Sequence, residues 1–118
     1  MAEKILVVDD DFEDLTRAKT ILEKSGYEVF SATNGVAGFD LVKENRFDLI
    51  LININMPTLS GYDLLRLLRS GPGKKTKMAY VSITPKKDVD MDSVDAFIQK
   101  PYSLEGFLKT VKSLLKRK

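Results

Sequence analysis

Two short runs of mostly branched apolar side chains dominate the pattern of hydrophobic and polar positions along the chain. Residues 4–8 have the sequence KILVV, and residues 47–52 have the sequence FDLILI. Such runs are typical of strands buried on both faces of a parallel sheet, and they are too short to cross a membrane. Pro57 follows the second run and cannot donate to a sheet ladder, so we expect a central strand and then a loop.

Helical spacing of apolar positions separates the predicted strands. It predicts helices over residues 12–25, about 35–42, about 61–70 and from about 103 onward. Further strands are predicted at residues 27–31, 78–84 and 95–99. This alternation predicts one α/β domain over residues 1–118, built on a five-stranded parallel sheet with right-handed crossovers.

The connection between the last two predicted strands is unusually short. It covers residues 85–94, whereas a crossover that contains its own helix needs about 10–12 residues. Pro85 at its start and the alternating acids Asp88, Asp90 and Asp92 also disfavour a regular helix. We therefore expect the fourth helix to be shortened or irregular.

The composition removes several kinds of chemistry. The chain contains no cysteine and no histidine, which excludes disulfides, thiol chemistry, histidine bases, histidine metal ligands and an autophosphorylating histidine. No hydrophobic signal segment follows Met1 and no apolar run has membrane length. We expect a cytoplasmic protein without a membrane partner.

Polar side chains end four of the predicted strands. Asp9 and Asp10, Asn53, Thr84 and Lys100 should meet at one edge, because the carboxyl ends of parallel strands lie together. Each has an ordinary explanation when taken alone: acids favour a following helix N-terminus, threonine caps and lysine is solvated. Their combination indicates a functional site.

This set resembles the receiver domain of two-component response regulators, over essentially the whole chain. The matching signatures are Val7-Val8-Asp9-Asp10, Asn53-Ile54-Asn55-Met56-Pro57 with Gly61, Ile83-Thr84 and Lys100-Pro101. The resemblance implies a flavodoxin-like, doubly wound sheet of strand order 2-1-3-4-5, as in CheY-like proteins. It also implies a phosphorelay signalling module rather than an enzyme. Its partner would be a sensor histidine kinase or another signalling protein, and we expect no output domain within this chain.

The resemblance assigns a role to each residue at this edge. Asp10 would bind Mg²⁺ directly and Asp9 through water, with the backbone carbonyl of Asn55 completing the protein ligands. Thr84 would hydrogen-bond a phosphoryl oxygen, and Lys100 would pair with the acceptor carboxylate and later with the phosphate. In the last strand, the switching aromatic residue matches Phe97.

Position 53 departs from the family pattern, because Asn53 stands where the family has its phospho-accepting aspartate. An amide nitrogen is not nucleophilic, and the amide oxygen lacks the full charge that attracts a hard cation. Phosphate should not be accepted here, and Mg²⁺ should bind only weakly. Pro85 is a second departure, since the family usually has a small residue beside the threonine.

Two interpretations of Asn53 remain open. The chain is either a native, phosphorylation-incompetent interaction module, or a conventional phospho-accepting receiver that carries an engineered Asp-to-Asn substitution. Pro85 and the short fourth crossover favour the native interpretation, because they also depart from the family pattern.

Basic side chains gather in the second half of a chain whose net charge is +2. Lys74, Lys75 and Lys77 lie in one predicted loop and residues 116–118 end the chain, so both should lie at the edge opposite the site. Nucleic-acid binding is disfavoured, because no aromatic side chains are interleaved and no reading helix accompanies them. Solvated charge is the favoured explanation. Flavin binding is also disfavoured, since no phosphate-cradling loop follows the first strand.

Overall fold

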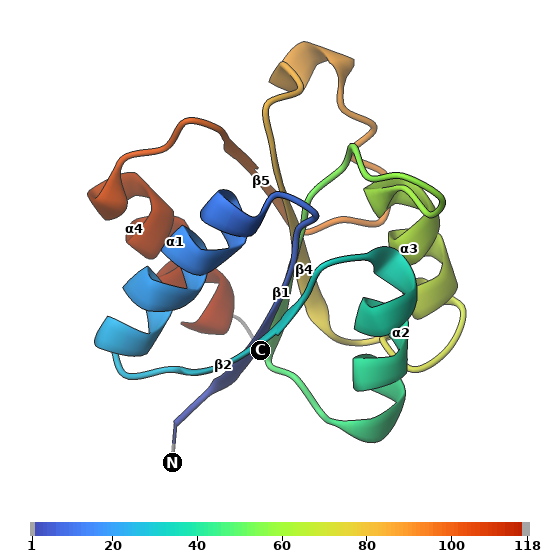
Figure 1. Cartoon of the computed structure of the whole chain (residues 1–118), viewed down its shortest axis with the longest axis horizontal. Coiled ribbons are helices and arrows are strands. Elements are labelled where there is room, and N and C mark those ends of the chain that lie inside the picture. The colour runs from blue at the N-terminus through green and yellow to red at the C-terminus, as the bar shows by residue number, and fades with distance from the viewer. Residues whose placement is uncertain (1, 117–118) are drawn as a thin grey trace.

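The computed structural model describes residues 2–116, in which five strands alternate with four α-helices (Figure 1). The elements are β1 (Lys4–Val8), α1 (Phe12–Lys24), β2 (Glu28–Ala32), α2 (Gly35–Glu44), β3 (Leu49–Ile52), α3 (Gly61–Arg69), β4 (Lys77–Ser82), β5 (Ala96–Gln99) and α4 (Leu104–Lys116). None of the helices in this range is long and apolar enough to cross a membrane. Arg117 and Lys118 of the predicted basic end lie outside the described residues.

The sheet is parallel and has the order β2-β1-β3-β4-β5, which confirms the predicted topology. Helices α1 and α4 cover one face, and α2 and α3 cover the other (Figure 1). Val8 pairs with Ile52 in the register of β1 and β3, so these two central strands end level with each other. The residues that follow them, Asp9 and Asn53, are therefore brought side by side.

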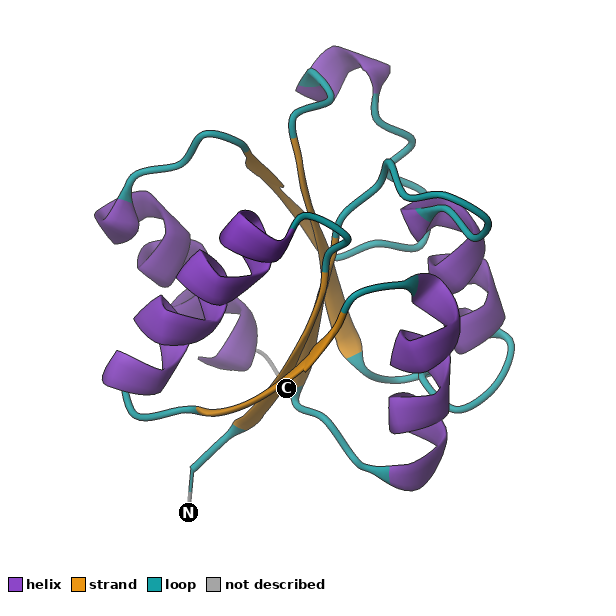
Figure 2. Cartoon of the chain, in the orientation of Figure 1, coloured by secondary structure: helices purple, strands orange, loops and turns teal. Residues whose placement is uncertain are grey.

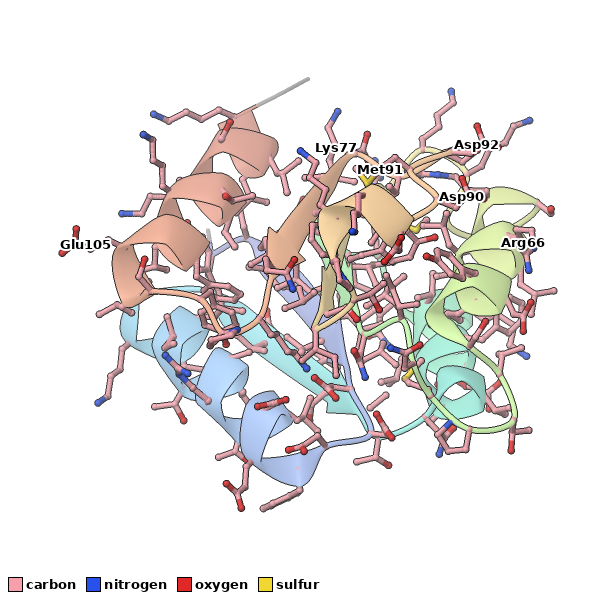
Figure 3. All side chains as sticks on the ribbon, turned by 90° about the horizontal axis from the view of Figure 1, so that it is seen from above. Arg66, Lys77, Asp90, Met91, Asp92 and Glu105 are labelled. Atoms are coloured by element: carbon pink, nitrogen blue, oxygen red, sulfur yellow. The ribbon has the colours of Figure 1, made fainter. Side chains whose placement is uncertain are left out.

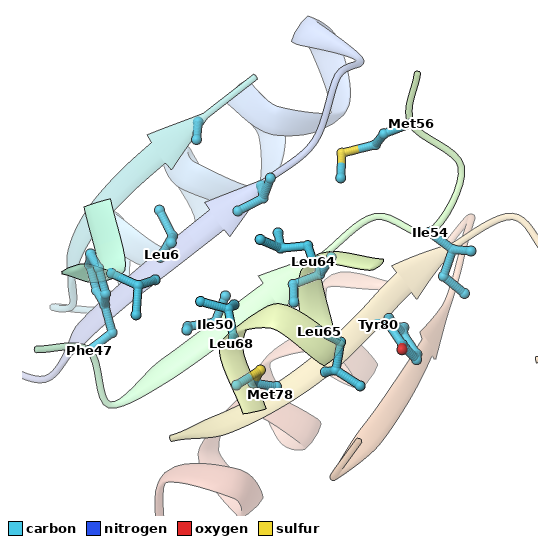
Figure 4. Close-up of a cluster of buried hydrophobic side chains, with 14 residues drawn as sticks. Leu6, Phe47, Ile50, Ile54, Met56, Leu64, Leu65, Leu68, Met78 and Tyr80 are labelled. Atoms are coloured by element: carbon cyan, nitrogen blue, oxygen red, sulfur yellow. The ribbon is translucent and has the colours of Figure 1, made fainter. Parts of the chain in front are cut away.

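The core consists of two layers, one on each face of the sheet. Ile50 and Ile52 of β3 face the layer under α2 and α3, while Leu49 and Leu51 face the layer under α1 and α4. Successive strand residues point to opposite faces, which is why this strand is apolar at every position. Figure 4 shows the first layer, where Leu64, Leu65 and Leu68 of α3 pack onto the sheet.

The connection from β4 to β5 contains a single turn of 3-10 helix, Lys86–Asp88, as its short length predicts. It lies over α3, because the Tyr62 hydroxyl accepts a hydrogen bond from the Asp90 amide. Figure 3 shows Asp90 and Asp92 beside Arg66 of α3. Within the described residues, no α-helix connects β4 to β5.

Strand β4 ends at Ser82, two residues before the predicted end. The Ser82 hydroxyl accepts a hydrogen bond from the Thr84 amide (3.3 Å), which turns the chain away from the ladder. Thr84 therefore stands in the loop just beyond the strand rather than at its last position.

Gly61 fixes how closely α3 approaches the end of β3. Its amide donates to the Ile54 carbonyl at 2.7 Å, and a Cβ here would overlap the Asn53 carbonyl and lie 2.7 Å from the Ile54 Cα. We expect Gly61→Ala to lower the free energy of unfolding by about 1–3 kcal/mol, the usual cost of overpacking. Urea unfolding of both proteins measures this change.

Gly71→Ala is the matched control for this prediction. A Cβ at Gly71 meets the Leu67 carbonyl at an ordinary 3.6 Å, so its stability should change by less than about 1 kcal/mol. Equal unfolding midpoints for the two variants would mean that α3 can move away from β3 without cost.

Candidate functional site

The predicted site residues meet at one edge of the sheet, the edge from which the strand-to-helix loops rise in Figure 2. Backbone hydrogen bonds carry the chain past the strand ends, from the Asn53 amide to the Val8 carbonyl (2.9 Å) and from the Lys100 amide to the Ser82 carbonyl (2.8 Å). These bonds hold Asn53 beside the end of β1 and Lys100 beside the end of β4.

Asn53 is buried, and its side-chain amide nitrogen donates two hydrogen bonds. One reaches Asp10 Oδ1 at 3.0 Å and the other reaches the Asn55 carbonyl at 3.2 Å. A carboxylate and a carbonyl can only accept, so the nitrogen rather than the oxygen of the amide must face them. The amide nitrogen therefore bridges the two oxygens that the family resemblance assigns to Mg²⁺.

Lys100 is held by two carboxylates. Its ammonium lies 2.7 Å from Asp9 Oδ2 and 2.9 Å from Asp14 Oδ2, and its side chain is only 10% exposed. This corrects the expectation that Lys100 pairs with the side chain at position 53. Asp14 lies in the first turn of α1, and 86 residues separate it from Lys100, so sequence spacing does not reveal the pair.

The ionisation of this pair follows from its burial. Burial raises the pKa of the Asp9 carboxyl, and this effect outweighs Lys100 and the Asp11 amide, which lower it. Burial alone would lower the pKa of Lys100, but hydrogen bonds to Asp14 and Asp9 and the charges of both carboxylates leave that pKa raised. The two carboxylates therefore keep the buried Lys100 ammonium in its charged form.

Thr84 belongs to a separate polar chain that links β3 to β4. Its hydroxyl accepts a hydrogen bond from the Asn55 side-chain amide at 3.0 Å and lies 3.1 Å from the hydroxyl of Ser82. Ser82 is fully buried and was not predicted as a site residue, because it lies inside an apolar strand pattern. Phe97 of β5 lies away from these polar groups, opposite Tyr80 and against the core under α2 and α3.

Each group assigned to Mg²⁺ already accepts at least one hydrogen bond. Asp9 accepts hydrogen bonds from Lys100 and from the Asp11 amide, while Asp10 and the Asn55 carbonyl accept from Asn53. Among residues 2–116, no cluster of three or more acidic, histidine or cysteine side chains could hold a metal ion. In this arrangement the site does not fit a hard cation, because an N–H donor stands between its oxygens.

Comparisons with known proteins agree with the observed fold. The family model described as response regulator receiver domain matches residues 5–112. The polar-differentiation response regulator DivK of Brucella anthropi is 30% identical over 98% of this chain and 98% of its own length. The chemotaxis protein CheY4 of Vibrio cholerae has a TM-score of 0.89 at 26% identity, covering 97% of this chain and 99% of that one. The response regulator TrrA of Thermotoga maritima, solved in complex with Mg²⁺ and BeF, has a TM-score of 0.87 at 26% identity, covering 95% and 98%.

Proposed function

The chain belongs to the response regulator receiver domain family, and on that basis we propose that it is a receiver-like interaction module that does not accept phosphate. A receiver that accepts phosphate needs a carboxylate nucleophile at the end of β3. Asn53 occupies that position, and an amide cannot perform the attack on phosphorus.

The observation that carries the proposal is the pair of hydrogen bonds from the Asn53 amide to Asp10 and Asn55. Both N–H groups of a buried amide are satisfied there, so the strand ends are held together without a metal ion or a phosphoryl group. The charge of Lys100 is likewise balanced by Asp9 and Asp14, so it does not need a phospho-accepting carboxylate or a phosphoryl group as a partner. The buried polar groups of Asn53 and Lys100 therefore have their partners within the protein, as expected for a module that works without phosphate.

Mg²⁺ binding should accordingly be weak. A cation that used Asp10 and the Asn55 carbonyl would first have to displace the Asn53 amide nitrogen from both oxygens. The hydrogen bonds lost in that step oppose binding, and the amide oxygen that could turn toward the ion carries no full charge. We propose that the module's partner is a sensor histidine kinase or another signalling protein that recognises its surface.

Incubation with acetyl phosphate and Mg²⁺ tests the proposal. We expect the intact mass of the chain to remain unchanged, because position 53 lacks a nucleophile. Under the same conditions, Asn53→Asp should acquire an acid-labile phosphoryl group. Intact-mass spectrometry before and after acid treatment measures both results.

A stoichiometric acid-labile adduct on the unaltered chain would overturn the proposal, and peptide mapping to Asp9, Asp10 or Asp11 would identify the acceptor. If neither protein is modified, the proposal stands and the site is disabled at a second place. Pro85, next to Thr84, is then the residue to replace by alanine in the Asn53→Asp background.

A further inference from the structure

A basic pocket lies at the opposite edge of the sheet from the candidate site. It has a volume of about 740 Å³ and is formed by the connection from α2 to β3 and the connection from α3 to β4. Both connections run along the lower edge of the molecule in Figure 1. The volume lies within the range of roughly 300–1,000 Å³ that is usual for small-molecule sites.

Cationic side chains line this pocket from both connections. Arg46 comes from the first connection, Lys74 and Lys75 come from the second, and Lys77 is the first residue of β4. None of the four forms an ion pair within the part of the chain that the structure describes. The lining also contains Lys43, which is paired with Asp40 at 3.2 Å.

Two acids share the lining and reduce its positive charge. Asp48 is already engaged, because its Oδ2 accepts a hydrogen bond from the Lys4 backbone amide at 2.7 Å. Glu44 forms no ion pair among residues 2–116, so its charge acts directly on any anion in the pocket. The hydrogen bond to Asp48 leaves its negative charge in place, but the four unpaired cations outnumber the two acids, and the pocket keeps a net positive charge.

Arg69 of α3 holds the lysine-bearing loop in place. Its guanidinium donates to the carbonyls of Gly73 (3.2 Å), Lys74 (3.4 Å) and Thr76 (2.6 Å). It also forms an ion pair with Asp95 at 3.0 Å, which ties the loop to the start of β5. Because the backbone of this loop is already fixed, binding would order only the lysine side chains and not the loop itself.

We propose that this pocket binds a linear polyphosphate group, either free or as part of a nucleoside triphosphate. Several phosphates in a row match several separated cations, with Arg46 able to grip two oxygens and the lysines acting as point charges. The apolar lining gives no stacking platform for a base, because Phe47 is only 5% exposed. Recognition should therefore depend on the phosphates, and extended single-stranded RNA should bind less well.

Isothermal titration calorimetry with tripolyphosphate tests the proposal, and ATP and adenosine distinguish the source of the group. We expect saturable 1:1 binding of tripolyphosphate and ATP and none of adenosine. Neutralising two lysines in Lys74→Gln/Lys75→Gln should weaken binding about tenfold. Glu44→Gln should strengthen it about two- to threefold, because it removes the opposing charge.

Lys109→Gln/Lys112→Gln is the matched control, since it removes two exposed lysines from α4, outside the pocket. This control should bind tripolyphosphate as the unaltered chain does. Absence of saturable binding, or equal loss in the control, would overturn the proposal and leave only diffuse positive charge. Tighter binding of single-stranded RNA than of tripolyphosphate would also overturn it, in favour of a nucleic-acid surface.

Discussion

Replacing Lys100 by methionine is expected to lower the free energy of unfolding by about 3–5 kcal/mol at pH 7, the cost of breaking a buried ion pair by removing one partner. Asp9 is 4% exposed and would keep only the Asp11 amide as a partner for its charge. Asp14 of α1, which is half-buried, would also lose its contact with the ammonium. Methionine retains the length and apolar contacts of the lysine stem, so the change isolates the charge. Urea unfolding measures the loss.

The pH dependence of this variant separates lost charge from lost packing. The pKa of Asp9 is already raised by burial, and without Lys100 it should rise further. A folded-state pKa above the unfolded value means that the folded protein binds more protons, so stability increases as the pH falls toward that pKa. The stability of Lys100→Met should therefore approach that of the unaltered chain between pH 7 and pH 5.

Lys109→Met is the control, because Lys109 is exposed on α4 and makes no ion pair in the described part of the chain. Its stability should change by less than about 1 kcal/mol at either pH. A constant deficit for Lys100→Met from pH 7 to pH 5 would attribute the loss to packing and contradict the ion-pair explanation.

The sequence predicts well which residues lie at the strand ends that form the candidate site, because strand ends are marked by local signals. A buried run followed by polar residues and proline places Asn53 at the end of β3, and parallel pairing then brings Asp9 beside it. The 3-10 turn between β4 and β5 is predictable for the same reason, since chain length limits what can fit.

The hydrogen bonds within the candidate site are not predictable from the sequence. The contact between Lys100 and Asp14 joins residues far apart in the chain, and its alternative, a contact with position 53, satisfies the same sequence pattern. The orientation of the Asn53 amide depends on which atoms surround it, and only the folded backbone places the Asn55 carbonyl beside Asp10. Ser82 is not predicted as a site residue, because the apolar run around it indicates burial but does not show that its hydroxyl lies beside that of Thr84.

Asn53→Asp is expected to lower the free energy of unfolding by about 2–3 kcal/mol in metal-free buffer, within the range for leaving buried polar groups unsatisfied. The sequence suggests such a loss from repulsion among carboxylates, with the amide accepting a hydrogen bond from Lys100. The structure gives a different cause: an oxygen would replace the nitrogen that lies 3.0 Å from Asp10 Oδ1 and 3.2 Å from the Asn55 carbonyl. Two donors would become acceptors facing acceptors, beside a like charge.

Mg²⁺ should narrow this gap, because an ion that binds the folded Asp variant stabilises it by mass action. The control is Asn45→Asp, which also converts a donating amide into a carboxylate, at the Leu41 carbonyl (3.0 Å) at the end of α2 and away from the acid pair. Urea titrations of the three proteins, with EDTA and with millimolar Mg²⁺, should show a Mg²⁺-dependent gain for Asn53→Asp alone. If Asn53→Asp is as stable as the unaltered chain under EDTA, the hydrogen bonds from the Asn53 amide to Asp10 and Asn55 do not hold the strand ends together. The same gain in Asn45→Asp would instead assign the Mg²⁺ effect to general screening of negative charge.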